Sequence, residues 1–488
     1  MPRILKNTSV FFKKSSSTVL PTETIFPAFK EATRVMDASL LAALARELGP
    51  GFRTDAAGRD AAATDDSGLL FRPDAVFFPK SAAEISRLMR LAHTHGFPVT
   101  PRGAGTGLCG GCLPVRGGVA VATTAMDRIR VIDTVNGVAV VEPGVVTKTL
   151  RDTAATKGLF YPPDPASYAT CTLGGNAATN AGGPACVKYG VTRDYVLGLT
   201  AVLPDGEFLK AGMATRKGVV GYDLAGLFVG SEGTLGIITE LTLKLIPHPR
   251  TVRTMLALFA DARAAVAAVS AVMTGGVCPS AVEFMDRACL GLVEELLPFA
   301  LPGRDAALLL LEVDGDADAT ARDIRRVADV CRDAGALEVL PADDAARREA
   351  LWDIRRQTST RIHESAPMYL SEDTVVPIAR IPDLIDALPG LGARFGMAVY
   401  AFGHAGDGNI HVNITGEDGS RARGHELIRA LVETVLTLGG TMSGEHGVGL
   451  TKQPFIGMEL SPRSLTLQQG LKDLFDPKGI MNPGKVLP

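Results

Sequence analysis

Residues 97–107 read FPVTPRGAGTG, in which a short apolar strand runs directly into a loop with glycines at positions 103, 105 and 107. Upstream, Ala75–Pro79 has the pattern of another strand, and Ser81 with Glu84 forms a capping box that opens a helix. Glycines allow successive backbone N–H groups to approach a diphosphate without side chains in the way. Strand, helix, strand and glycine loop therefore predict the start of an α/β nucleotide-binding unit.

A Rossmann loop for NAD is the obvious alternative, but that loop must open a helix. Here the loop continues as Leu108–Pro114 (LCGGCLP), which cannot start one. Two more glycine-rich tracts follow, Cys171–Gly183 (CTLGGNAATNAGG) and Gly230–Gly236 (GSEGTLG). Such tracts are best explained as backbone wrapped closely around a ligand, not as core elements. Glycine-rich loops at the ends of strands predict an elongated ligand-binding groove, which is far larger than a single phosphate group requires.

Composition narrows the class of protein. A chain of 488 residues with 46% hydrophobic residues should divide into two or more well-packed domains. The net charge of -3 gives no reason to expect nucleic acid as a partner, and no apolar run approaches the ~20 residues that cross a bilayer. The seven scattered cysteines indicate a reducing compartment and show no iron–sulfur pattern. Cys109 and Cys112 have the spacing of a zinc pair but lack a second pair.

The sequence patterns divide the chain into four parts. Residues 1–35 are basic and serine-rich, which predicts a poorly ordered extension or a misassigned start or, alternatively, a transit peptide. Residues 36–250 carry the glycine loops, and in residues 251–440 apolar strands alternate with alanine-rich helices. This alternation predicts a cap with an antiparallel sheet and helices on one face, a ferredoxin-like arrangement. Residues 441–488 are expected to return to the first domain, so that a ligand site lies at the interface.

Two stretches carry the chemistry. The stretch SGEHGVG sets Glu445 and His446 side by side between glycines, a pairing suited to holding a metal and taking a proton from a metal-bound alcohol. In the cap, a hairpin loop at 406–409 would make His404 and His411 oppose each other, with Cβ atoms about 5 Å apart. Glu445 would complete a set of two histidines and one carboxylate with open positions for a substrate. The alternative is a pair of packed, structural histidines.

Several motifs together resemble one family. The stretches PRGAGTGL, PPDPAS, TLGGNAATNAGG, KYGVTRD and VGSEGTLGIITE resemble the FAD-binding domain of the vanillyl-alcohol oxidase or PCMH type, and the GEHG stretch resembles the FAD-linked oxidase C-terminal domain. Taken together, from about residue 40 to the end, they resemble the D-lactate dehydrogenases and the flavin subunit of glycolate oxidase. The resemblance implies an α+β fold: a PCMH-type FAD-binding domain of two α/β subdomains, a ferredoxin-like antiparallel cap and a C-terminal segment that returns to the FAD domain.

The resemblance implies a non-covalent FAD, because the first glycine loop lacks the histidine to which some relatives attach the cofactor. The diphosphate would lie on that loop, and the rest of the cofactor along the later tracts and the C-terminus. The residues implied in binding are Arg102, Gly103, Ala104, Gly105, Thr106, Gly107, Pro163, Asp164, Thr172, Gly174, Gly175, Asn180, Gly182, Glu232, Gly233, Ile238 and Asn482.

The resemblance also implies a divalent metal, Zn, Mn or Fe, with His446 as the base or, alternatively, as an orienter of a ligand. Arg355 resembles the arginine that pairs with the substrate carboxylate, and the alternative is an arginine on a surface helix. Asn413 lies on the same strand face as His411 and matches a residue that contacts substrate or metal. The implied metal ligands are His404, His411 and Glu445.

The implied reaction is the oxidation of a small D-2-hydroxy acid, D-lactate or glycolate, to the 2-oxo acid. Ser371 stands where the related 2-hydroxyglutarate dehydrogenases have a lysine for a second carboxylate, and D-2-hydroxyglutarate is the alternative substrate. Alkyl-glycerone-phosphate synthases, of another reaction class, share the fold but have histidine at the position of Glu445. The set of three histidines and one glutamate also counts against a third alternative, a non-catalytic FAD subunit.

The sequence leaves the electron acceptor open among a quinone, a cytochrome, an electron-transfer flavoprotein and an iron–sulfur subunit. A homodimer is compatible with it. We expect a cytoplasmic protein, compatible with peripheral attachment to the inner membrane, or a mitochondrial one if the N-terminal extension is a transit peptide.

Overall fold

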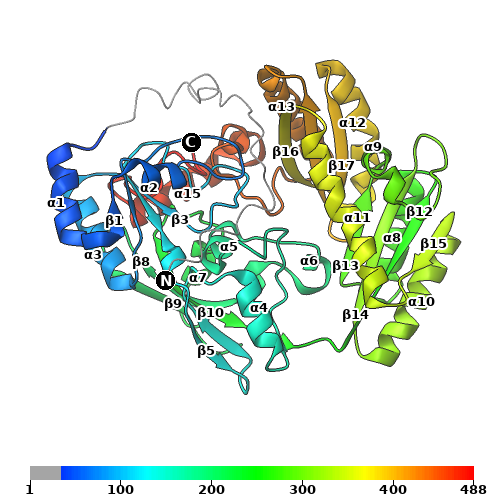
Figure 1. Ribbon diagram of the computed structural model, residues 1–488, viewed down its shortest axis with the longest axis horizontal. Coiled ribbons are helices and arrows are strands. Elements are labelled where there is room, and N and C mark those ends of the chain that lie inside the picture. The colour runs from blue at the N-terminus through cyan, green and yellow to red at the C-terminus, as the bar shows by residue number, and fades with distance from the viewer. Residues whose placement is uncertain (1–34) are drawn as a thin grey trace.

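The computed structural model describes residues 35–488, so the predicted N-terminal extension lies almost entirely outside the described residues. Figure 1 shows two lobes, with the first lobe joined by the C-terminal elements and the second formed by the middle of the chain. None of the described helices is both long and apolar enough to cross a membrane.

The first sheet of the first lobe contains the predicted nucleotide-binding unit. Its strand order is β1-β2-β4-β3, and β4 runs parallel to both β2 and β3. Ser81 caps the intervening helix by accepting a hydrogen bond from the Glu84 backbone N–H, as its sequence predicts. The bounds are α1 (Ala38–Leu48), β1 (Phe52–Arg53), α2 (Ala56–Ala61), β2 (Ala75–Phe77), α3 (Ala82–His95), β3 (Val99–Arg102) and β4 (Val119–Ala122).

A second, antiparallel sheet follows in the same lobe, with the order β5-β6-β10-β8-β9. One expectation about this region was wrong: part of the glycine tract at 171–183 forms the short helix α5, whose Leu173 and Ala177 are buried in the core. Glycine serves helix packing here, because a Cβ at Gly174 would lie 2.5 Å from Pro143. The bounds are β5 (Ile129–Asp133), β6 (Val138–Val141), α4 (Thr147–Ala155), β7 (Leu159–Phe160), α5 (Leu173–Thr179), α6 (Cys186–Tyr189), β8 (Val196–Val202), β9 (Phe208–Gly212), α7 (Leu224–Phe228), β10 (Ile237–Lys244) and β11 (Ile246–Pro247).

The second lobe, which we call the cap, is built on one seven-stranded antiparallel sheet with the order β15-β12-β14-β13-β17-β18-β16. The strands β15, β12, β14 and β13 follow the ferredoxin-like order. The pairing of β13 with β17 joins this unit to a second, similar unit. In the second unit the fourth strand is reduced to a single bridge between Val375 and Thr441. The strand bounds are β12 (Thr251–Phe259), β13 (Ala281–Met285), β14 (Ala307–Gly315), β15 (Glu338–Pro341), β16 (Met368–Val375), β17 (Ala398–His404) and β18 (Asn409–Gly416).

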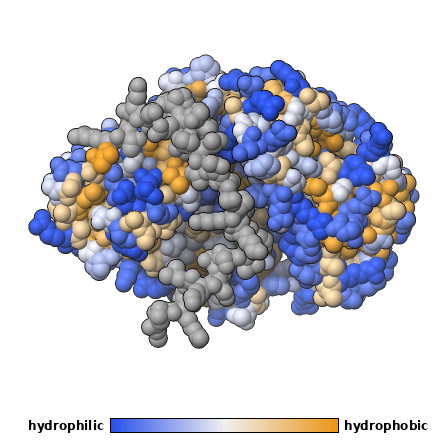
Figure 2. All heavy atoms as spheres, turned by 45° about the horizontal axis from the view of Figure 1, so that its top comes forward, coloured by the Kyte–Doolittle hydropathy of each residue, from blue (hydrophilic) through white to orange (hydrophobic). Residues whose placement is uncertain are grey.

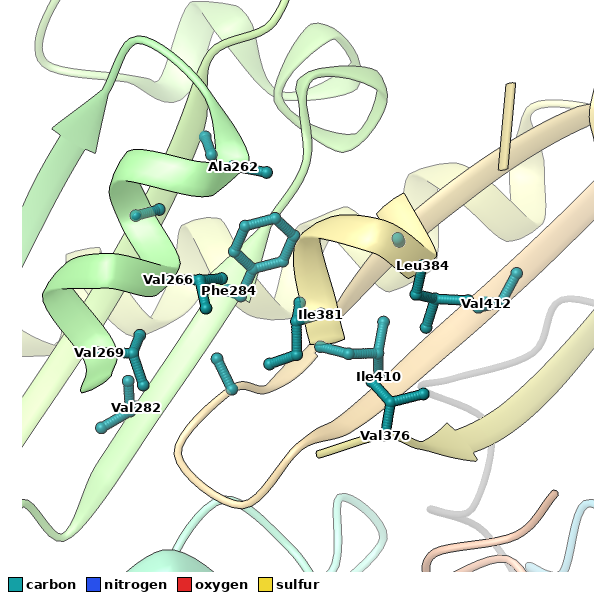
Figure 3. Packing of buried hydrophobic residues seen from close by; sticks show 14 of the residues in the cluster. Ala262, Val266, Val269, Val282, Phe284, Val376, Ile381, Leu384, Ile410 and Val412 are labelled. Atoms are coloured by element: carbon teal, nitrogen blue, oxygen red, sulfur yellow. The ribbon is translucent and has the colours of Figure 1, made fainter. Parts of the chain in front are cut away.

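Helices cover both faces of the cap sheet, not one face as the sequence predicted. On one face, α8 (Ala262–Thr274), α10 (Ala317–Asp333), α12 (Ile381–Phe395) and α13 (Arg421–Thr437) close the larger core. Figure 3 shows this packing, with Val266 of α8 near Phe284 of β13. On the other face, α9 (Arg287–Leu292) and α11 (Ala345–Glu364) cover only part of the sheet. The uncovered part of that face carries polar residues, and the site is built there.

The last segment of the chain returns from the cap to the first lobe. After α14 (Ile456–Glu459) and α15 (Pro462–Phe475), the backbone of Ile480 and Asn482 exchanges two hydrogen bonds of 2.8 Å with Val99 of β3. Met481 is completely buried in the core of the first sheet.

In the space-filling view, hydrophilic residues alternate with smaller apolar patches on the visible parts of both lobes (Figure 2).

Candidate active site

The hairpin of β17 and β18 presents two histidines, but in a different register from the predicted one. His404 pairs with Asn409, and Phe402 pairs with His411, so the loop spans 405–408 and not 406–409. The loop closes early because the backbone N–H groups of residues 407 and 408 both donate to the His404 carbonyl. His404 and His411 are therefore diagonal neighbours, and because the change in register is two residues both still lie on one face.

Three ligand atoms converge beside this hairpin. The Nε2 atoms of His404 and His411 lie 3.4 Å apart, and each lies 3.5 Å from Oε1 of Glu445. Two ligand atoms at ~2.1 Å from a tetrahedral zinc ion are about 3.4 Å apart, so the spacing fits a divalent metal held by these three groups. Both histidines are buried, and such donor atoms facing one another without an ion are poorly solvated.

Asp373 holds the loop that carries Glu445 and His446. Its Oδ2 accepts hydrogen bonds of 2.8–2.9 Å from the backbone N–H groups of three consecutive residues, 444–446. Burial alone would raise the pKa of the Asp373 carboxyl, but the positive charge of Lys452 and these hydrogen bonds hold the pKa well below its usual range. The charged carboxylate therefore fixes the backbone of the loop, and sequence reasoning missed this residue.

His446 lies over the hairpin that carries His404 and His411. Its ring is stacked on that of His411, with centroids 5.2 Å apart and planes inclined by 12°. Burial lowers the pKa of His446 to about 4, so its imidazole is neutral near pH 7 and can accept a proton. Among the described residues, the buried Nδ1 of His446 has no hydrogen-bond partner.

Asn413 is completely buried on the same sheet face as His411. Its Oδ1 accepts a hydrogen bond of 2.8 Å from the Tyr369 hydroxyl, while no described residue accepts a hydrogen bond from its Nδ2. Ser371 lies directly opposite Asn413 in the pairing of β16 and β18. A buried amide with one unused donor indicates that a ligand completes this part of the site.

Arg355 is not a surface arginine, because its side chain is only 11% exposed on α11. Its Nε donates a hydrogen bond of 2.7 Å to Glu283, and its guanidinium lies 4.1 Å from the centre of the Phe402 ring. Glu283 also accepts a hydrogen bond from Nδ1 of His404. Sequence reasoning missed Glu283, although a charge within the otherwise apolar strand AVEFM is itself a signal, since charged groups are almost never fully buried unless paired.

The first glycine loop has free donors. In the described part of the chain, no group accepts a hydrogen bond from the backbone N–H groups of residues 104–107. The Arg102 guanidinium folds under this loop, since a Cβ at Gly105 would lie 2.0 Å from its Nη2. A Cβ at Gly103 would lie 2.5 Å from Thr172 Oγ1, a buried hydroxyl that itself has no partner among the described residues. These features fit an anionic diphosphate on the loop.

The other predicted cofactor residues fall into two groups. Gly182 borders the candidate metal ligand Glu445, since a Cβ at Gly182 would lie 2.6 Å from its Oε2. Asn482 donates hydrogen bonds of 2.8 and 2.7 Å to the carbonyls of Gly111 and Glu232 in the first lobe. The remaining residues make contacts within the protein, and their predicted contacts with the cofactor stay predictions. Pro163 accepts a hydrogen bond from Arg151, Asp164 accepts one from the Ala185 N–H, and Asn180 accepts one from the Arg193 N–H. Gly174 and Gly233 pack against prolines, Gly175 packs near Thr172, and Ile238 lies in the core.

Comparison with known proteins defines the class of protein. Residues 73–212 match the family described as "FAD binding domain", and residues 248–486 match "FAD linked oxidases, C-terminal domain". The chain belongs to the FAD-linked oxidases and is an FAD-linked oxidoreductase, which confirms the predicted class.

Two relatives show how close the match is. The glycolate oxidase subunit GlcD of Bacillus subtilis is 40% identical over 417 residues, covering 85% of this chain and 89% of that protein. A D-lactate dehydrogenase of Anaerostipes hadrus is 37% identical over 426 residues, covering 85% and 90%.

Solved structures confirm the predicted PCMH-type fold. An alkyldihydroxyacetonephosphate synthase matches with a TM-score of 0.75 at 22% identity, covering 93% of this chain and 88% of the other. p-Cresol methylhydroxylase matches with a TM-score of 0.74 at 16% identity, covering 92% and 96%. At these identities the likeness concerns the fold alone.

Proposed function

We propose that this enzyme oxidises a small D-2-hydroxy acid to the 2-oxo acid, using non-covalent FAD and a divalent metal. The observation that carries the proposal is the convergence of His404, His411 and Glu445 beside His446. It occurs in a chain whose relatives are named glycolate oxidase subunit GlcD and D-lactate dehydrogenase.

The three converging groups would hold the metal through two imidazole nitrogens and one carboxylate oxygen, leaving further positions open. When bound, the metal would polarise the substrate hydroxyl, and FAD would supply the acceptor for the Cα hydride. His446, whose ring is stacked on that of His411, takes the hydroxyl proton.

Arg355 and Asn413 orient the substrate in this proposal. Glu283 occupies Nε of Arg355, which leaves the two terminal nitrogens of the guanidinium for a substrate carboxylate. Asn413 offers its unused Nδ2 to a carboxylate or hydroxyl oxygen. Both groups are buried, so a carboxylate that reaches them is bound with little screening by water.

The substrate is proposed to carry one carboxylate. Ser371, opposite Asn413, has a short neutral side chain where a second carboxylate would need a positive charge. D-Lactate and glycolate therefore fit better than D-2-hydroxyglutarate. The fold shared with the alkyl synthase does not extend to chemistry, because the carboxylate of Glu445 completes a metal site.

The electrons must leave the reduced FAD to a second acceptor. The relative from Bacillus subtilis is named a subunit, which supports an acceptor on another polypeptide. The candidate acceptors are a cytochrome, an electron-transfer flavoprotein or an iron–sulfur subunit, each carried by another polypeptide, and, alternatively, a quinone.

Anaerobic reduction of the flavin tests the proposal. Purified holoenzyme is mixed with D-lactate, glycolate, L-lactate or D-2-hydroxyglutarate, and bleaching of the flavin absorbance is followed by stopped flow. We expect D-lactate or glycolate to bleach the flavin fastest, L-lactate to fail, and removal of the metal with a chelator to abolish bleaching. An enzyme that is equally fast after metal removal would contradict the metal-dependent mechanism.

A further inference from the structure

Glu283 is a buried carboxylate with two partners, and both belong to the candidate site. It lies at the centre of β13 and is completely inaccessible to solvent. One carboxylate oxygen accepts a hydrogen bond from Nδ1 of His404, and the other accepts one of 2.7 Å from Nε of Arg355. We propose that Glu283 is a positioning residue that sets the metal-binding histidine and the carboxylate-binding arginine at once, an inference that rests on the proposed function.

On the histidine side, Glu283 selects the tautomer. A carboxylate oxygen only accepts, so Nδ1 of His404 carries a proton, and the neutral imidazole that binds a metal then presents the lone pair of Nε2. That lone pair is on the side of the ring where Glu445 Oε1 and His411 Nε2 lie, at 3.5 and 3.4 Å. A carboxylate on the second ring nitrogen orients a metal-binding histidine and raises its basicity.

On the arginine side, Glu283 and the Phe402 ring hold the guanidinium by its edge and by its face. Within the described residues, the terminal nitrogens of Arg355 donate no hydrogen bond. The negative charge of Glu283 offsets the cost of burying the guanidinium before substrate arrives. The arginine is therefore held ready without using the two donors that a carboxylate needs.

Register places these groups together. Glu283 pairs directly with His404 between β13 and β17, at the junction of the two ferredoxin-like units. The strand pair thus links the unit that supplies Glu283 to the unit that supplies both histidines. Neither unit alone contains the complete arrangement.

A glutamine at position 283 is the discriminating substitution. Its amide offers one acceptor oxygen to two donors, so either His404 or Arg355 loses its partner and the amide N–H₂ opposes it. Glu283→Asp keeps both acceptors and the charge but shortens the side chain by one methylene group. Glu312→Gln is the matched control, because Glu312 lies one strand away and accepts hydrogen bonds from Thr254 and Trp352, not from site residues.

The experiment measures Zn²⁺ affinity of the full-length, FAD-loaded protein by chelator competition after the metal has been stripped, together with flavin content. For Glu283→Gln we expect affinity to fall by about 10–100-fold with FAD retained. The Zn²⁺ affinity of Glu283→Asp should fall by less, and that of Glu312→Gln should equal the wild-type affinity. With saturating Zn²⁺, Glu283→Gln should also raise KM for the 2-hydroxy acid more than it lowers kcat.

Unchanged Zn²⁺ affinity in Glu283→Gln overturns the inference, as does a wild-type protein that binds no Zn²⁺. If Glu283→Gln loses its flavin through misfolding, Glu283→Asp decides: weakened affinity with FAD retained supports the inference, and wild-type affinity overturns it. Failure of the proposed function has a different signature. In that case the wild type binds Zn²⁺ and the variants weaken it, but no 2-hydroxy acid bleaches the flavin.

Discussion

The carboxylate of Glu232 accepts a hydrogen bond of 2.9 Å from the backbone N–H of Gly449, which lies 217 residues further along the chain. The same carboxylate accepts a bond of 2.7 Å from the N–H of Val448. The third glycine loop of the first lobe is thereby fastened to the loop that carries Glu445 and His446. The carboxylate therefore links two distant parts of the chain, and its predicted position beside the cofactor stays a prediction.

Replacing Glu232 with glutamine should loosen this connection. The amide oxygen can keep the Val448 donor and the longer, 3.2 Å bond from the Gly449 N–H, while the amide N–H₂ replaces the oxygen that accepts the 2.9 Å bond from Gly449. Such a loss costs about 1–3 kcal/mol, which thermal unfolding of the holoenzyme would reveal as a lower Tm. Glu240→Gln is the control, because Glu240 makes a partly exposed ion pair with Arg130. A Tm equal to that of the control would argue against the connection.

Replacing Asp373 with asparagine should lower the free energy of unfolding more than replacing Glu232 with glutamine does. Lys452 is completely buried next to Asp373, and removing the carboxylate takes away the counter-charge that acts most strongly on its ammonium group. Breaking a buried pair in this way typically costs 3–5 kcal/mol. Urea unfolding should show the loss, and the exposed Asp386→Asn should change the free energy of unfolding by less than about 1 kcal/mol. Comparable stability of the two variants would refute the account.

Replacing His411 with alanine should remove the metal and keep the flavin. The substitution deletes one of the three proposed metal ligands, whereas the first glycine loop and Thr172, proposed to hold FAD, belong to the other lobe. Elemental analysis should find substoichiometric metal beside a normal flavin spectrum. His248→Ala, at the exposed end of the first lobe, should retain both. A variant at position 411 that loses FAD and metal together would point to a structural role for the histidine pair.

Local patterns in the sequence predicted much of this architecture. Ser81 caps its helix, and the two histidines share a face of the hairpin even though its register was wrong by two residues. The two histidines still lie on the same face despite this error, because side chains alternate with a period of two along a strand. The glycines at 406 and 408 permit either loop, so the sequence alone could not choose between them.

The residues that the sequence did not reveal are isolated carboxylates on strands. Glu283 and Asp373 belong to no local motif, and their roles arise from strand pairing and from contacts with a loop about 70 residues distant in the chain. Periodicity marks such strands as buried but says nothing about which neighbour meets the charge. Only the order of the strands in the cap sheet brings Glu283 to His404 and Asp373 to the Glu445 loop.

Position 371 should control the choice between one and two carboxylates. Ser371 faces Asn413 across β16 and β18, so a lysine there would place an ammonium group near the substrate side of the site. We expect Ser371→Lys to raise kcat/KM for D-2-hydroxyglutarate relative to D-lactate by roughly tenfold or more, since a favourable interaction of ~1.4 kcal/mol suffices for that factor. Ser371→Met is the control for length without charge, and it should not favour the dicarboxylate. If both variants shift the ratio equally, the effect is one of pocket shape, and the charge at this position does not set specificity.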